Sequence, residues 1–382
     1  MIRIMDIYEY IQDNYNLHLN PKYTKHEEFF RYFQREMERK YGIKTIEIYS
    51  TSMFPRQVSV GNERYYLSDN HFWNMYEHYL TAYFLCSRRI SIGISYDNLM
   101  SMISNMLLLA MANLQDHHPH LALSFAQEYQ RCGMRMGDYA KSFFDTGVIP
   151  EIDRIVFFSY VSVFIHELAH KRYNSLECDE SGFNDFIKIL ESFPKDKMPL
   201  NENMRNAILE MQRLLAENDK KGLEELYCDF CSMVSVIDLV VKKCGDTFDL
   251  DECVKLTMES LMLPIIFQVL LVQNQLFWEH KYYQFFYMDM KAEKTLKKIK
   301  KLFTETMSRT SFICLIAQVY LVDQYSVSAD AVNLIKVSEF DDISKYLLDS
   351  RHSFEILQRT EDNEKKYSMY EARELRDKIL RW

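Results

Sequence analysis

The sequence predicts a predominantly helical α+β protein with a small antiparallel sheet near its N-terminus. Only 9 glycines and 7 prolines occur among the 382 residues, which favours long helices with few tight turns over a sandwich or barrel. Apolar residues make up 48% of the chain, enough for a sizeable core. The clearest strand pattern lies between Lys44 and Leu67. We therefore expect one short β region and helices elsewhere.

Residues 1–145 form the first predicted region, and two helices are expected to open it. Ile7, Tyr10 and Ile11 have the spacing of an apolar helical stripe. The segment His26–Tyr41 is amphipathic and rich in charge, which is typical of a surface helix.

The predicted sheet follows directly. Lys44–Tyr49 alternates between apolar and polar residues and is rich in β-branched side chains, so we expect a strand. Gln57–Val60 and Arg64–Leu67 flank Gly61-Asn62-Glu63, which predicts a hairpin with glycine in its turn. These segments together predict the small antiparallel sheet.

Helices are expected again after the sheet. Ser68 or Asp69 is placed to cap a helix over His71–Cys86, and Tyr96–Leu114 is predicted as an apolar helix rich in Met and Leu. A break follows at residues 116–120, where Pro119 stands among three histidines. We interpret this break as an exposed turn, with the helix resuming at Leu121.

Residues 146–245 form the second predicted region. Pro150 marks the start of a helix, and the run from Ile155 to His170 is apolar nearly all round, which indicates a buried helix. Amphipathic helices are expected at Asn203–Asn218 and Leu223–Lys243.

Residues 246–382 form the third predicted region, which we expect to be helical. Separate segments are predicted at Cys253–Glu279, Lys291–Phe303 and Ser311–Asp323, followed by a charged C-terminal segment. An amphipathic helix in this region carries a basic run: Lys294, Lys297, Lys298, Lys300 and Lys301. Such a run is typical of a solvated face, and it also fits an acidic partner or a membrane surface.

The buried helix of the second region carries the sequence His166-Glu167-Leu168-Ala169-His170. Residues four apart lie on one face of a helix, so His166 and His170 can offer two imidazoles to one metal ion. Glu167 lies beside the same ion, where it can act as general base on a water molecule that the metal activates. Unpaired polar groups in a buried helix cost several kcal/mol, and a metal ion supplies the missing partners.

This HExxH motif, followed by Glu225-Leu226-Tyr227-Cys228-Asp229, resembles the zincin metallopeptidases of the gluzincin type, whose pattern is HExxH with ExxxD on a second helix. The resemblance implies a Zn²⁺ cofactor held by His166, His170 and Glu225, with Glu167 as catalytic base. It also implies that Asp229 hydrogen-bonds the outer nitrogen of a ligand histidine. Glu224 is the alternative third ligand.

The same resemblance implies further features of the site. In zincins, the active-site helix packs under a small sheet whose edge strand binds the substrate backbone, and the predicted hairpin can supply that sheet. A group that stabilises the oxyanion is also expected. His280 and Tyr283 are candidates, because they stand in a polar aromatic segment after a buried helix.

We therefore predict an intracellular zinc metalloendopeptidase of narrow protein specificity. The N-terminal residues have neither a signal-peptide nor a transmembrane pattern, which predicts a cytoplasmic protein with no membrane span. The net charge of −9 argues against a nucleic-acid partner, so the expected partner is a protein or peptide substrate. The alternatives are a non-catalytic zincin-like protein with a structural metal and a helical interaction scaffold without one.

Overall fold

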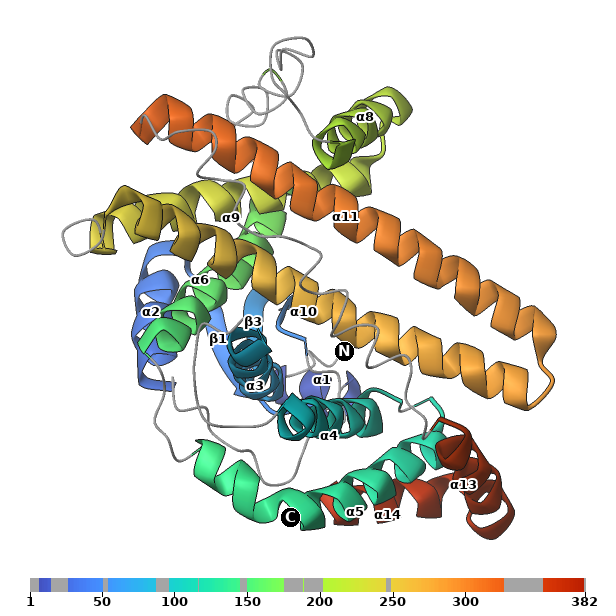
Figure 1. Cartoon of the computed structure of the whole chain (residues 1–382). Helices are drawn as coiled ribbons and strands as arrows, with labels where there is room; N and C mark the ends of the chain where they lie inside the picture. Colours follow the sequence, from blue (N-terminus) through green and yellow to red (C-terminus); the bar gives the residue numbers. More distant parts are fainter. Residues whose placement is uncertain are drawn as a thin grey trace, which may run out of the picture.

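The computed structural model describes residues 7–14, 27–50, 54–86, 96–115, 117–144, 150–174, 188, 202–244, 249–325 and 353–380. Helices dominate these residues, together with one three-stranded sheet, as the sequence predicts (Figure 1). The strands are β1 (Lys44–Ile48), β2 (Arg56–Val60) and β3 (Glu63–Asp69). The helices are α1 (Ile7–Asn14), α2 (Glu27–Tyr41), α3 (Asn70–Cys86), α4 (Tyr96–Leu114), α5 (Pro119–Phe144), α6 (Pro150–Asn174), α8 (Glu202–Glu217), α9 (Lys220–Cys244), α10 (Leu250–Phe285), α11 (Asp289–Tyr325), α13 (Ser353–Lys366) and α14 (Met369–Leu380).

The sheet is mixed, and the prediction that it is antiparallel is wrong for one of its two strand pairs. The hairpin β2–β3 is antiparallel as expected, with Val58 opposite Tyr65. However, β1 pairs with β3 in parallel, with Ile46 opposite Leu67, and the strand order is β1-β3-β2. The central strand β3 is the most deeply buried of the three, and β2 returns the chain so that β3 can run beside β1. This order leaves β2 at an edge of the sheet.

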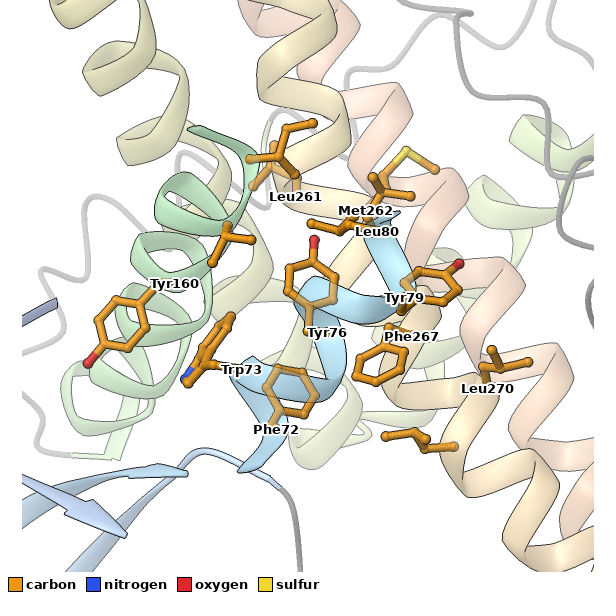
Figure 2. Packing of buried hydrophobic residues seen from close by; sticks show 14 of the residues in the cluster. Phe72, Trp73, Tyr76, Tyr79, Leu80, Tyr160, Leu261, Met262, Phe267 and Leu270 are labelled. Carbon is orange, nitrogen blue, oxygen red and sulfur yellow. The ribbon is translucent and has the colours of Figure 1, made fainter. Parts of the chain in front are cut away.

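The helix α3 begins where β3 ends and brings a column of aromatic side chains into the core. The Asp69 carboxylate accepts a hydrogen bond from the backbone N–H of His71 (3.1 Å), so Asp69 is the predicted helix cap. Tyr76 and Tyr79 of α3 pack against Phe267 of α10, with ring centroids 5.6 and 5.0 Å apart (Figure 2). Trp73 lies 5.0 Å from the ring of Tyr160 on α6. Aromatic packing therefore joins α3, α6 and α10 in one core.

The helices α6 and α9 pack closely against each other, and small polar residues lie at their contact. The Ser232 hydroxyl donates a hydrogen bond to the Ser162 carbonyl at 2.8 Å, and the two hydroxyl oxygens are 2.9 Å apart. Both side chains are buried and small enough to let the helix backbones approach. Since Ser162 is one turn before His166, this contact holds the first histidine against α9.

Two long helices form a hairpin across one side of the molecule, with α11 lying along α10 (Figure 1). The third region is more continuous than predicted, because residues 304–310 continue α11 without a break. This stretch is polar, but it contains neither glycine nor proline, the residues that most often break a helix. The helix α10 also continues through Pro264.

One described helix, α10, is long and apolar enough to cross a membrane. However, 67% of its most apolar window is buried inside the protein, as expected for a core helix. The main core draws on all three predicted regions, since α10 packs against α3, α4, α6 and α9.

Candidate metal centre

The two histidines of the HExxH motif lie one turn apart on α6 and face α9. Their ring centroids are 5.0 Å apart, and their planes are nearly perpendicular, at 82°. Their side chains are 12% and 24% exposed, so His166 is the more deeply enclosed. The buried helix that the sequence predicts therefore brings both imidazoles to one surface of contact with α9.

The Nε2 atoms of both imidazoles point toward one carboxylate. Glu225 Oε2 is 3.4 Å from His166 Nε2, and Glu225 Oε1 is 4.0 Å from His170 Nε2. Two imidazole nitrogens near one carboxylate are donor types that suit a divalent cation.

The outer nitrogens of the same imidazoles are held by two other carboxylates. His166 Nδ1 lies 2.9 Å from Asp229 Oδ1, and His170 Nδ1 lies 2.9 Å from Glu224 Oε1. Because an ionised carboxylate can only accept, each Nδ1 is the donor, and the lone pair of a neutral ring stays on Nε2. Glu224, the alternative third ligand, thus lies at an outer nitrogen, whereas Glu225 lies at both inner ones.

Arg309 of α11 joins this centre, and sequence reasoning missed it. Its Nε and one terminal nitrogen donate to the two Asp229 oxygens at 2.6 and 2.7 Å, and its other terminal nitrogen lies 4.0 Å from Glu225 Oε2. Asp229 is only 3% exposed, so the arginine supplies the charge partner that a buried carboxylate requires. Arg309 follows Asp229 by 80 residues and belongs to no motif, so no spacing indicates it.

The charges of this centre shift the proton affinities of its members. Burial opposes the charge on His166, but bonds from Asp229 and Glu225 outweigh burial and raise its pKa to about 9. Burial favours the neutral form of Glu225, but His166 and Arg309 outweigh it and lower the pKa of this carboxyl to about 2. The pKa of Asp229 is also held well below its usual value, against burial, by Arg309 and His166. The carboxylates of the centre thus favour the positively charged form of the His166 imidazole.

A cavity of about 200 Å³ opens beside the histidines. One part of its lining is polar and comes from α6, α9 and α11: His166, Glu167, His170, Glu225, Asp229 and Arg309. Apolar side chains form much of the rest: Pro55, Phe72, Val163, Leu261, Pro264, Ile265 and Ile313. The donor set is therefore accessible to a small molecule or a side chain.

The edge strand β2 reaches the same place. The backbone N–H of Gln57 donates to Glu167 Oε2 at 3.1 Å. Gln57 stands opposite Tyr66 in the ladder, and its N–H is directed to Glu167 on α6, so the outer edge of β2 faces the motif. This contact fixes one oxygen of the Glu167 carboxylate at the cavity.

The two oxyanion candidates lie elsewhere. His280 is twelve residues beyond Gln268, which lines the cavity, and this separation corresponds to about 18 Å along α10. His280 Nδ1 bonds the carbonyl of Ala292 at 2.8 Å, and the Tyr283 hydroxyl lies 3.2 Å from His118 Nε2. Both residues thus belong to the packing at the α10–α11 turn, where Tyr283 holds a histidine of the predicted exposed turn.

Cys228 offers a second possible ligand set. Its sulfur, together with one ring nitrogen from each of His166 and His170, forms a group within 4.8 Å. However, Cys228 is completely buried and is not part of the cavity lining. Burial, reinforced by the negative charges of Asp229 and Glu225, raises the pKa of the thiol and disfavours the thiolate. Glu225, in contrast, lies near both Nε2 atoms and lines the cavity, so the set with Glu225 is the one that a substrate can reach.

Comparisons of this chain with protein-family models, with curated proteins and with solved structures found no match.

Proposed function

We propose that this protein is a zinc-dependent metallopeptidase that hydrolyses a peptide bond in the cavity beside His166 and His170. One observation carries the proposal: both Nε2 atoms converge on Glu225, while carboxylates hold both Nδ1 atoms. In this proposal the fold is a zincin-like core in which α6 carries the motif and α9 the third ligand.

The residues present fit a zinc ion. His166, His170 and Glu225 would hold it, and they supply two nitrogens and one oxygen, a donor set of catalytic zinc sites. Zinc bound there would lower the pKa of water and polarise a substrate carbonyl. Asp229 and Glu224 orient the imidazoles, and Arg309 keeps Asp229 ionised and in place.

Glu167 is the proposed general base. Its Oε2 is held by the Gln57 amide, so the other oxygen is the one that would take a proton from the attacking water. The same carboxyl group can then pass the proton to the leaving nitrogen. A residue one position after a ligand histidine, with its carboxylate already oriented, is suited to this task.

The proposed substrate is an extended peptide. The outer edge of β2 faces the site, and an edge strand can pair with the backbone of an added strand. The apolar part of the cavity lining, including Phe72, Leu261 and Ile265, fits an apolar side chain next to the bond to be cut.

A structural metal site is the second candidate, and Cys228 is the observation that favours it. If Cys228 completed a set of four protein ligands, the site would be closed and would hold no reactive water. The two candidates therefore differ in ligand number and in the role of Glu167.

Three preparations test the proposal: wild type, Glu167→Gln and His170→Ala. We expect one zinc per wild-type chain by elemental analysis, the same content in Glu167→Gln, and little zinc in His170→Ala. Cleavage of a proteome-derived peptide library, read by mass spectrometry, should fall by a factor of about 10² to 10⁴ in Glu167→Gln. Wild-type protein that takes up no zinc on reconstitution contradicts both metal candidates, and undiminished cleavage by Glu167→Gln contradicts the catalytic one.

A further inference from the structure

The turn between α10 and α11 exposes large apolar side chains at the end of a long helical hairpin. Tyr287 is 91% exposed and Met290 is 87% exposed. In the described part of the chain, eleven large hydrophobic side chains are exposed, and four of them lie between residues 287 and 296. Figure 1 shows this turn at one edge of the molecule, where the two helices end together. The apolar side chains are thus concentrated at a tip.

Lysines lie directly behind this tip on α11. Residues 287–301 contain six lysines and two acidic residues, although the whole chain has a net charge of −9. Met290, Lys294, Lys298 and Lys301 follow one another at helical spacing, so they share one face. Ala292 is buried on the opposite side of the helix, and Thr295 is buried between that side and the lysine face. The exposed face of α11 therefore joins an apolar tip to a row of positive charge.

The conformation of Tyr287 shows that the turn itself does not require this side chain. Its φ of 55° lies in the left-handed region, which favours glycine or asparagine and is costly for a bulky residue. An exposed aromatic ring at this backbone position contributes little to the core. A solvated helix face explains the lysines, but it does not explain Tyr287 and Met290.

We propose that this tip, Tyr287 to Met290 with the lysine face of α11, docks on a membrane surface that contains anionic phospholipids. The apolar side chains would enter the interface between headgroups and acyl chains, and the lysines would meet the lipid phosphates. An acidic protein would match the lysines, but it would need a shaped pocket for the tyrosine and methionines. A lipid surface accepts both the lysines and the apolar side chains without a shaped pocket.

Vesicle sedimentation tests the proposal on the full chain. Wild type should bind vesicles of phosphatidylcholine with phosphatidylserine, should not bind phosphatidylcholine alone, and should lose binding at high salt. Each lysine near an anionic surface contributes about fivefold to the affinity, so Lys294→Gln/Lys298→Gln/Lys301→Gln should bind about a hundredfold more weakly. Tyr287→Ser/Met290→Ser should bind at least about tenfold more weakly, because the apolar anchors are gone.

The matched control is Lys221→Gln/Lys242→Gln/Lys243→Gln, which removes the same charge from exposed positions on α9 and should bind like wild type. All substituted side chains are exposed, so equal thermal midpoints should show that every variant folds. The proposal is overturned if wild type ignores phosphatidylserine vesicles or if the α11 variant binds as well as the control. It is also overturned if the Tyr287/Met290 variant binds vesicles normally while wild type is retained on immobilised polyglutamate, since an acidic protein would then be the partner.

Discussion

Asp229 and Glu128 are both deeply buried carboxylates, with 3% and 2% of their side chains exposed. Asp229 lies between α9 and α11 and binds Arg309 and His166. Glu128 lies on α5, where Arg131 Nε donates to it at 3.0 Å and Arg359 of α13 donates at 2.9 Å. Both carboxylates therefore have cationic partners that offset the cost of burial.

The difference between the two networks lies in the partners beyond the first arginine. Asp229 binds the Nδ1 atom of His166, and the Nε2 atom of the same ring faces Glu225 and the cavity. The partners of Glu128 are two arginines and the thiol of Cys132, and an arginine does not give up its proton to bind a metal. The Asp229 network is thus a candidate functional site, because it includes an imidazole and lines a cavity. Among the residues that the structure describes, the Glu128 network has neither feature and holds helices together.

The strongest way to test this comparison is to remove Glu225. We expect Glu225→Ala to lose more than about a hundredfold in zinc affinity, because it removes a direct ligand, and outer partners alone are worth about ten- to a hundredfold. Glu128→Ala is the matched control and should keep full zinc content despite its loss of stability. Competition with a fluorescent zinc chelator measures both. Equal zinc affinity in Glu225→Ala and wild type would assign the third ligand elsewhere.

Removal of the arginines should affect stability by different amounts. Arg309→Met leaves Asp229 without its main cationic partner, and we expect a cost of about 3–5 kcal/mol in the free energy of unfolding of metal-free protein. Arg359→Met should cost about 1–2 kcal/mol, because Arg131 still binds Glu128. Denaturant unfolding in the presence of a chelator measures both variants. The comparison fails if Arg309→Met is the more stable of the two.

The sequence predicts the parts of these two networks that depend on local spacing, but not the contacts between residues far apart in the chain. The motif on α6, its burial and the position of Glu225 on α9 follow from helical spacing, which is local. Arg309 and Arg359 do not, because each reaches its partner through helix packing over 80 and 231 residues. The parallel pairing of β1 escapes prediction for the same reason, since alternation marks a strand but not its neighbour.

Acid should weaken the Glu128 network in a defined pH range. Burial raises the pKa of Glu128, but the bonds from Arg131 and Arg359 outweigh burial and lower it from 4.5 to about 2. Folding therefore favours the ionised form, so its contribution is complete above about pH 4.5 and is lost as the pH falls toward 2. We expect wild type to exceed Glu128→Gln by up to about 3 kcal/mol near neutral pH, with the gap closing below pH 4.5. Thermal midpoints of both proteins over this range check it, and a gap that widens in acid contradicts it.

The smallest expected effect concerns Cys228, and it tests whether the centre is open or closed. If the Glu225 set holds the metal, Cys228→Ala removes only a buried thiol beside Ala169 and Tyr227, at a stability cost of about 1 kcal/mol. Zinc affinity should then stay within about threefold of wild type, since removing even an outer partner costs at least about tenfold. Chelator competition on Cys228→Ala, with Glu225→Ala measured beside it, separates the two ligand sets. A large loss of affinity in Cys228→Ala would place the thiolate on the metal, and the centre would then resemble the Glu128 network in purpose, as a structural joint between helices.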